Sequence, residues 1–482
     1  MQKKCKIYIF VWIYKIGVIE CLSIVLYQWT IFNFNKSDLN FFKSIFPFSK
    51  IKFWWVSITN KILFFLLVNG VILAETNDLK YLGTKQPYIY KEITVKTPEG
   101  YVPFYINHIS RHGSRHLSSS KYDKSIYELL DLAEKEKKLT FEGKKLKGKV
   151  EEILKIEKGN YGLLTSIGVE EQKGIAKRMY ENNKEVFEKE VEAVATYVKR
   201  AQESRDAFLE ELSEYTPNIK FKVSTNGKED IELRFFDISS AYLEYEKKEP
   251  WKTEYKKYSK TKDYTNRILE QFFAKEFIEK LNRGEIQLKS EEGKVILKSG
   301  DDAVSNLYDL YVLQADIGKD FDIGKYFTEE ELKWYEELDN IKTFYEKGPG
   351  MTGENIATDI AIPLLKEFIE TSDKAIENKN ISANLRFAHA ETIIPFISIM
   401  EIEGMSEKQN DMSKVYQTWD GSKISCMAAN IQWIFYKNET NDIIVKILHN
   451  EEPVSLPIKT DIAPFYKWSE MKEFYNKKLY IK

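Results

Sequence analysis

The sequence is poor in the residues that crosslink protein chains or bind metals. It contains three Cys and five His among 482 residues. Cys5 and Cys21 lie close to the N-terminus, and only Cys426 follows them. A lone Cys can form no internal disulfide, so residues 75–482 have neither an internal disulfide nor a Cys-based zinc site. Small and apolar neighbours on both sides of Cys426 predict a buried structural thiol.

The sequence also lacks an excess of one charge sign. Its 72 Lys and Arg against 74 Asp and Glu give a formal charge of −2, which gives no indication of nucleic-acid binding. A hydrophobic share of 43% and an aromatic share of 14% exclude a disordered chain, and 30% charged residues exclude a polytopic membrane protein. The length predicts one large domain or two.

The charges are unevenly distributed along the chain. Residues 1–74 hold nine Lys against Glu20 and Asp38, a formal +7, whereas the other 408 residues hold 63 basic and 72 acidic residues, a formal −9. The sequence therefore consists of a basic leader and an acidic body.

The leader contains the two longest apolar runs, residues 8–32 and 62–74. The second run follows Lys61 and ends at Ala74, just before a polar sequence. A basic flank, a short apolar stretch and a small residue at its end predict a secretory signal at about residues 56–74. This run is too short to span a bilayer comfortably.

The leader is longer than a secretory signal needs. Its upstream part is interpreted as an over-long gene prediction. The alternative is that residues 8–32 anchor the protein in a membrane, although Lys15 and Glu20 interrupt that run. We therefore expect an exported protein, periplasmic or secreted, with membrane anchoring through the N-terminal apolar segments as the alternative.

Strand and helix patterns alternate at both ends of the body. Strands rich in β-branched, aromatic and other apolar residues are expected at residues 101–110, 191–196 and 384–388, and a hairpin at 429–436 and 443–448. Amphipathic helices are expected over 121–158, after Thr165-Ser166, around Arg200, and over 393–400. Residues 240–375 show helical periodicity at 268–281, 303–313 and 353–369, with little strand pattern.

These patterns predict an α/β fold, with a three-layer, mainly parallel sheet between flanking helices and an inserted helical cap domain. The predicted organisation is a leader at residues 1–74, an α/β domain at 75–239 and 376–482, and a mainly helical cap at 240–375.

Three of the five His recur at a helical spacing. His108, His112 and His116 would share one face of a helix and could there hold a metal. The preceding run is strand-like, however, and Arg111 and Arg115 would set two cations beside the metal. We therefore expect no metal and no cofactor. His108 and His449 are interpreted as structural, and His116 as part of a pocket wall.

The same segment suits a phosphate site at the end of a strand. In open α/β sheets, ligands collect at the carboxyl ends of strands. The guanidinium groups of Arg111 and Arg115 offer paired donors to phosphate oxygens. Gly113 would permit a tight turn and keep a Cβ out of the anion's space. Neighbouring cations should hold His112 neutral, and a neutral imidazole is a nucleophile.

Two motifs that follow strands carry a family resemblance. Arg-His-Gly-x-Arg at 111–115 and His-Ala-Glu at 389–391 resemble the histidine phosphatase superfamily, in its branch of histidine acid phosphatases and phytases. The sequence His-Ala-Glu-Thr is similar to that of multiple inositol polyphosphate phosphatases. The resemblance covers most of residues 97–460, with further motifs in the family's order at 162–168, 196–208, 385–392, 427–432 and 448–451.

The resemblance implies a metal-independent phosphomonoesterase that works in two steps. His112 would attack phosphorus to form a phosphohistidine, and Glu391 would protonate the leaving alcohol and then activate water. Because a cationic pocket lowers the pKa of a carboxyl, Glu391 needs an environment that retains its proton. The groups implied to surround the phosphoryl group are Arg111, Arg115, Arg200 and His389.

One position departs from the family pattern. Many members have Pro two residues after the second Arg, where this sequence has Leu117, which puts the rigidity of the loop in question.

The implied substrates are inositol polyphosphates such as phytate, with a broad-specificity acid phosphatase as the alternative. A rival of another class is a non-catalytic phosphate-ligand binder on the same fold, but binding alone needs neither His112 nor Glu391. The expected partner is a small phosphorylated substrate. No nucleic acid is expected, and a membrane only through an uncleaved leader. The oligomeric state and the phosphate that is removed first are open.

Overall fold

The computed structural model describes residues 79–247, 251–378 and 380–479. The predicted leader and its signal lie outside these ranges. The described residues all belong to one compact unit. Within the described ranges, no helix has both the length and the apolar character needed to cross a membrane.

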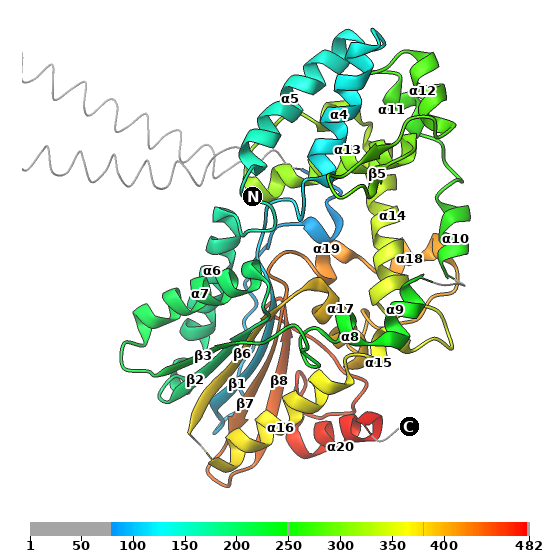
Figure 1. The fold of residues 1–482 in the computed structure, drawn as a ribbon. Helices are drawn as coiled ribbons and strands as arrows, with labels where there is room; N and C mark the ends of the chain where they lie inside the picture. Colours follow the sequence, from blue (N-terminus) through cyan, green and yellow to red (C-terminus); the bar gives the residue numbers. More distant parts are fainter. Residues whose placement is uncertain (1–78, 248–250, 379, 480–482) are drawn as a thin grey trace, which may run out of the picture. The chain divides into compact units, whose positions relative to one another are not determined.

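An eight-stranded sheet forms the centre of this unit (Figure 1). Its order is β10-β8-β7-β1-β6-β2-β3, and β9 pairs with β8. Neighbours among β1, β6, β2 and β3 are parallel, whereas β7 runs antiparallel to β1 and forms a hairpin with β8. The strands are β1 (Val102–Arg111), β2 (Glu190–Ala195), β3 (Phe221–Thr225), β6 (Ile381–Ala388), β7 (Asn430–Lys437), β8 (Ile443–His449), β9 (Glu452–Pro453) and β10 (Phe465–Lys467).

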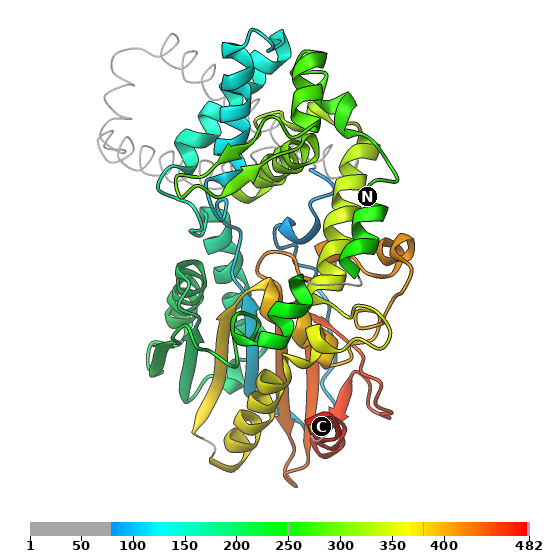
Figure 2. The same cartoon turned by 45° about the vertical axis from the view of Figure 1, so that its right-hand side comes forward.

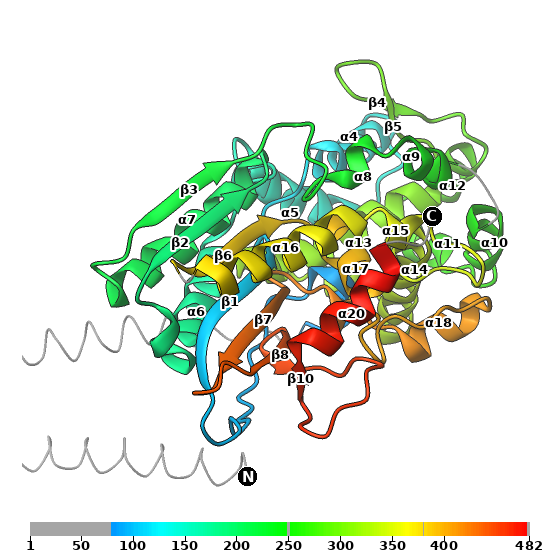
Figure 3. The ribbon, with the colours of Figure 1, turned by 90° about the horizontal axis from the view of Figure 1, so that it is seen from below.

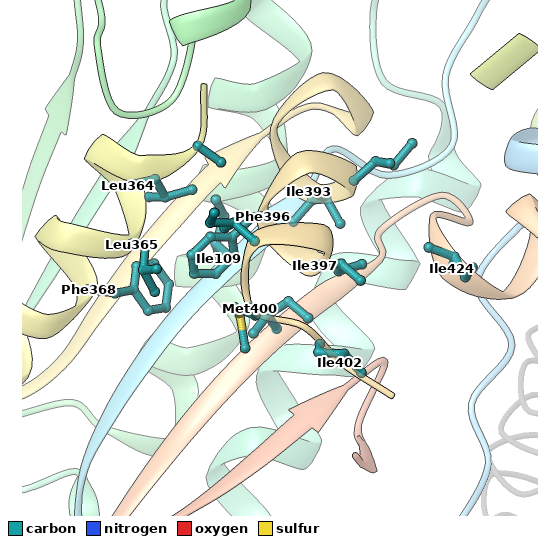
Figure 4. Packing of buried hydrophobic residues seen from close by; sticks show 14 of the residues in the cluster. Ile109, Leu364, Leu365, Phe368, Ile393, Phe396, Ile397, Met400, Ile402 and Ile424 are labelled. Carbon is teal, nitrogen blue, oxygen red and sulfur yellow. The ribbon is translucent and has the colours of Figure 1, made fainter. Parts of the chain in front are cut away.

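Helices cover both faces of the sheet, as Figure 3 shows from below. One face carries α6 (Ser166–Asn182) and α7 (Lys199–Tyr215), and the other carries α16 (Ile362–Asn378), α17 (Ala390–Ile399) and α20 (Trp468–Leu479). Side chains alternate between the faces along a strand. In β1, Ile106 belongs to the first core, and Tyr105 and Ile109 belong to the second. Figure 4 shows Ile109 between Leu364 and Phe368 of α16 and Ile393 and Phe396 of α17.

A second group of helices lies beyond the carboxyl ends of the parallel strands. It includes α4 (Lys121–Lys135), α5 (Phe141–Glu157), α11 (Thr265–Leu269), α12 (Lys275–Asn282) and α13 (Gly300–Ile317), which share one hydrophobic cluster. The long helix α14 (Glu329–Lys347) runs from this group toward the sheet (Figure 2). Leu332 packs on the cluster of this group, and Phe344 belongs to the core against the sheet.

The remaining elements are short. They are η1 (Gly83–Lys85), η2 (Lys184–Val186), α8 (Phe235–Ile238), α9 (Ser240–Lys247), α10 (Trp251–Tyr258), β4 (Leu288–Lys289), β5 (Val295–Leu297), η3 (Gly324–Tyr326), α15 (Ile356–Asp359), α18 (Met412–Thr418) and α19 (Gly421–Ile424).

The predicted α/β class, with helices on both faces of a sheet and a helical cap, is confirmed. The hydrophobic clusters cut across the domain division drawn from the sequence, because α4 and α5 of the predicted α/β domain pack with α13 of the predicted cap. The boundaries at residues 240 and 375 stay a prediction.

Two of the three predicted helical stretches in the cap region are interrupted. The stretch 268–281 breaks between α11 and α12, because Phe272 O and Ala274 N bond to the backbone of residues 138–140 instead of continuing a helix. The stretch 353–369 contains α15 and then α16, whose second residue is Pro363. Proline has no N–H for a preceding helical turn and suits the first turn of a new helix.

Candidate active site

His112 and His389 follow neighbouring parallel strands. Arg111 ends β1 opposite Ala388, which ends β6, so the next residue of each strand lies at the same edge of the sheet. The two imidazole centroids are 5.6 Å apart, and both side chains are buried. The His112 N–H also donates to Ala388 O at 3.0 Å. Sheet register therefore brings together the His of the two family motifs.

A third parallel strand completes this edge. Thr196 follows β2, and its Oγ1 lies 2.9 Å from His389 Nε2. Helix α7 starts three residues later and carries Arg200 in its first turn. Ser204 Oγ, one turn further, accepts from the Gly113 N–H at 3.1 Å and donates to Arg200 O at 2.8 Å. Helix α7 is thus fastened to the loop that carries His112.

Gly113 has a different task from the one expected. A Cβ at Gly113 would lie 2.5 Å from Gly168 O, and a Cβ at Gly168 would lie 2.2 Å from Ser114 O. Gly168 is in the first turn of α6, whose N-cap is Thr165, as the sequence predicts. The missing Cβ therefore makes room for the backbone of α6 and not for the anion.

The loop after Arg115 is held by a buried carboxylate. Glu157, at the end of α5, accepts from the Leu117 N–H at 2.8 Å, and its other oxygen lies 2.8 Å from His116 Nδ1. A Pro at position 117 would lack that N–H. The loop that has Leu117 in place of Pro is thus held by the contacts of Glu157 with the Leu117 N–H and with His116.

The site's arginines have nitrogens without partners. Arg111 Nη1 donates to Thr84 O at 2.6 Å and to Ser425 O at 2.5 Å, which fixes its guanidinium. Among the described residues, no partner is found for four buried nitrogens: Arg111 Nε, Arg115 Nε, Arg200 Nε and His389 Nδ1. Nor does any of these arginines form an ion pair with a described carboxylate. Buried donors without partners are costly, so this set is arranged for an anion.

The surroundings of His112 keep its ring neutral. Burial is the largest cause, followed by the charges of Arg200 and Arg111, and together they lower the pKa of His112 well below its usual value. His112 Nδ1 lies 2.9 Å from Gly113 O. A carbonyl oxygen only accepts, so Nδ1 carries the proton. The lone pair is therefore on Nε2, which makes Nε2 the nucleophilic atom.

Arg200 experiences the same burial and repulsion. Burial, and then the charge of Arg115, lower the pKa of Arg200 to about 10. Arg200 is still protonated near neutral pH. The charges at this edge repel one another in the absence of a ligand, and an anion would relieve that repulsion.

Glu391 has an ion-pair partner that the sequence does not indicate. It lies in the first turn of α17, and its Oε1 accepts from Lys347 Nζ at 2.6 Å. Burial favours its neutral form, but the charge and hydrogen bond of Lys347, together with His389, hold the pKa of Glu391 well below its usual value. In the protein without ligand, Glu391 is therefore a carboxylate.

A cavity of about 690 Å³ opens between this edge of the sheet and the cap helices. Five of the six predicted site residues line it, and the sixth, His389, contacts the ring of His112. The other charged residues in its wall are Lys85, Lys121, Lys262, Asp301, Asp302, Asp309, Asp316, Asp339, Lys342, Glu346 and Lys347.

The three His at helical spacing have separate surroundings. Because they lie on a strand and its loop, they share no helical face. His108 packs against Phe208 and Phe387, whereas His112 lines the cavity. His449 lies 2.8 Å from Ile424 O, away from the cavity wall. Cys426 is free and buried, as predicted.

Three residues that support the site were missed in the sequence. Glu157 had a usable signal, because it continues the buried face of α5 after Val150 and Ile153. An acidic residue on an apolar face indicates a specific buried contact. Thr84 acts through its backbone carbonyl, and Lys347 is one of many lysines, so nothing in the sequence distinguishes either of them.

Comparisons with known proteins identify the family and the fold. The model of the histidine phosphatase superfamily (branch 2) matches residues 105–450. Human multiple inositol polyphosphate phosphatase 1 is 25% identical over 164 residues, which cover 31% of this chain and 33% of that protein. The matched part thus spans about a third of this curated relative.

Solved structures extend the comparison to the whole fold. The multiple inositol polyphosphate phosphatase of Bifidobacterium longum, in complex with inositol hexasulfate, is 25% identical, with a TM-score of 0.74 over 82% of this chain and 97% of that chain. The phytase of D. castellii shares the fold at 15% identity, with a TM-score of 0.58 over 85% of this chain and 89% of that chain.

Proposed function

Because this chain belongs to branch 2 of the histidine phosphatase superfamily, we propose that it is a phosphomonoesterase that hydrolyses inositol polyphosphates through a phosphohistidine. The observation that carries the proposal is the group of buried arginine nitrogens without partners around His112. An anion of phosphate's size and charge would satisfy them, and His112 lies among them with a free lone pair.

The first step forms the covalent intermediate. His112 Nε2 attacks phosphorus, a nitrogen–phosphorus bond forms, and the ester bond to the leaving oxygen breaks. Negative charge on the other phosphoryl oxygens is stabilised by Arg111, Arg115, Arg200 and His389. These groups are already oriented, so little reorganisation accompanies the reaction.

Glu391 handles the proton in both steps. In its protonated form it gives its proton to the leaving alcohol. In the second step the resulting carboxylate takes a proton from water as the water oxygen attacks phosphorus. The nitrogen–phosphorus bond then breaks, and inorganic phosphate and neutral His112 are regenerated. Both steps conserve protons overall.

Two observations support a polyphosphorylated substrate. The relative from Bifidobacterium longum was solved with inositol hexasulfate, a ligand with six anionic groups on one ring. The cavity here has room beyond a single phosphate, and five lysines lie in its wall. We also propose that the protein is exported, on the basis of the basic, apolar sequence before Glu75.

The test of this function is phosphate release from inositol hexakisphosphate and from an aryl phosphate by the purified protein in EDTA. We expect turnover of both substrates, of the aryl phosphate because a phenolate leaves without first being protonated, and none with His112→Ala, whose fold is checked by circular dichroism. Absence of turnover with wild type would refute the enzyme, and metal-dependent turnover would refute this mechanism. Substantial residual turnover by His112→Ala would show that another group is the nucleophile.

A further inference from the structure

The ion pair of Lys347 and Glu391 joins a helix that reaches the cap to the acid of the proposed reaction. Lys347 is the last residue of α14, and Glu391 lies at the start of α17. Their side chains are 19% and 33% exposed, and both line the cavity. A ligand in the cavity can therefore reach the ion pair.

Other titratable groups face this pair from each surrounding element. Helix α14 contributes Asp339 and Glu346, and α9 contributes Glu246 and Tyr242. From the edge of the sheet, Arg111, Arg200 and His389 face Glu391. Among the described residues, Lys347 is the one side chain that forms a hydrogen bond or an ion pair with the Glu391 carboxylate. It is therefore the group that decides the state of this acid.

The pair as it stands cannot perform the proposed chemistry. A general acid must carry a proton when the leaving group departs. Lys347 stabilises the ionised form, and its ammonium occupies the oxygen Oε1. Something that arrives with the substrate has to remove Lys347 from Glu391.

We propose that Lys347 is a positioning residue that exchanges the Glu391 carboxylate for a phosphate group of the substrate. The exchange leaves Glu391 free to take up a proton from solvent and to face the leaving oxygen. This inference rests on the proposed function and adds a specificity to it. Binding of a second phosphate group of the substrate to Lys347 is therefore the event that allows Glu391 to become protonated.

The chemistry of the groups favours this exchange. An ammonium has three N–H donors, and a phosphate dianion offers more charge and more acceptor oxygens than a carboxylate. A substrate with a single phosphate places that group on the arginines and His112 and has none left for Lys347. Inositol polyphosphates carry neighbouring phosphates, so they can occupy both places.

The experiment compares pH profiles of wild type, Lys347→Met, Lys347→Arg and the control Lys342→Met, with inositol tetrakisphosphate as substrate. Lys342 lies on the same helix and lines the same cavity. Activity falls as pH rises through the pKa of Glu391, because the acid then loses its proton. We call the part of each pH profile where activity falls at high pH its alkaline limb. The alkaline limb of kcat/KM reports the pKa of the acid in the free enzyme, and that of kcat reports its pKa in the enzyme–substrate complex.

For Lys347→Met, we expect the alkaline limb of kcat/KM to move upward by about one pH unit or more, because the cation that lowers the pKa of Glu391 is gone. The limb of kcat should stay in place, because Lys347 has already left Glu391 in the complex. We expect KM to rise about tenfold through loss of the phosphate contact. Lys347→Arg should keep the wild-type limbs. Lys342→Met should keep them too, and a rise in its KM measures the loss of a cavity lysine that forms no ion pair with Glu391.

Two results would overturn the exchange. If Lys347→Met has the same alkaline limbs and the same KM as wild type, then Lys347 neither binds the substrate nor affects the protonation of Glu391. An equal upward shift of both limbs would mean that Lys347 stays on Glu391 throughout turnover. The His112→Ala variant separates the two proposals, since its residual turnover tests the covalent mechanism whatever Lys347 does.

Discussion

The two walls of the cavity differ in how their charged side chains are held and paired. We call the group Arg111, His112, Arg115, Arg200 and His389 the floor, and the cavity residues of α13 and α14 the roof. Four of the five floor residues end or follow strands β1 and β6, and Arg200 lies in the first turn of α7 after β2, whereas the roof consists of helix side chains. The floor arginines have no carboxylate partner in the described ranges, whereas Lys347 of the roof is paired with Glu391. The roof also carries four Asp of α13.

This difference separates two tasks. Unpaired, pre-oriented cations bind one phosphoryl group strongly, because the folding of the sheet has already oriented the donors. A roof of mixed charge discriminates, because a ligand must exchange partners with groups that are already satisfied. We therefore propose that the floor accounts for catalysis and the roof for the choice among phosphorylated compounds.

The largest effect is expected from a change in the floor. Arg200→Ala should lower kcat/KM about 10²–10³-fold, because one donor to the transition state is lost. No hydrogen bond of the Arg200 guanidinium to a described residue is found, so its loss leaves no protein group unpaired. Steady-state kinetics and thermal unfolding measure the two consequences.

Without ligand, Arg200→Ala should melt at the wild-type temperature or slightly above it, since repulsion from Arg115 is relieved. Inorganic phosphate should raise the melting temperature of wild type more than that of the variant. A variant that unfolds without ligand would contradict the idea that the floor charges repel one another.

A second effect concerns the junction of roof and floor at Asp316. Burial is the main cause that raises the pKa of Asp316 to about 8, although Arg115 opposes the rise. Since this pKa exceeds the unfolded value of 3.8, the contribution of Asp316 to stability is present below pH 4 and lost as pH rises toward 8. Asp316→Asn removes this dependence.

The unfolding free energy of Asp316→Asn relative to wild type should therefore increase between pH 5 and pH 7, by about 1–2 kcal/mol. Urea unfolding at pH 5, 6 and 7 measures this difference. A difference that is constant with pH would show that Asp316 does not titrate in this range.

The smallest effect is expected from a change confined to the roof. Burial, together with Asp339, raises the pKa of Asp309 to about 6 against the opposing charge of Lys85. Above that pH, Asp309 adds a negative charge to the wall that faces a polyanion. Asp309→Asn should lower KM for inositol hexakisphosphate about threefold at pH 7.5 and leave it unchanged at pH 4.5. A KM reduced equally at both pH values would contradict the electrostatic cause.

The residues of the floor could be predicted from the sequence because short local patterns identify the strands that carry them. The strand that ends at Arg111 is rich in β-branched and aromatic residues, and the strand before His389 is a short apolar run with Leu385 and Phe387. The carboxyl ends of parallel strands in α/β sheets lie together. Side chains that follow such strands can be assigned to one site without knowledge of the cap. The start of α6 at the N-cap Thr165 could likewise be predicted from the residues around it.

The roof depends on contacts that no local pattern encodes. Lys347 meets Glu391 across 44 residues, where the end of one helix approaches the start of another. The breaks at residues 270–274 and 360–361 arise from backbone pairing with a distant segment and from Pro363, and they interrupt apolar periodicities that look continuous. The edge strand β3 was missed although a usable signal was present, because Ile219, Phe221 and Val223 alternate with polar residues as in a half-buried strand.

The covalent role of His112 is tested most directly by rapid acid-free quenching of turnover with radiolabelled inositol hexakisphosphate, followed by peptide mapping of the labelled protein. The account predicts acid-labile, base-stable phosphate on the peptide that contains His112, formed at least as fast as phosphate is released, and none on His112→Ala. Turnover with no labelled protein, or with label on a different residue, would contradict it.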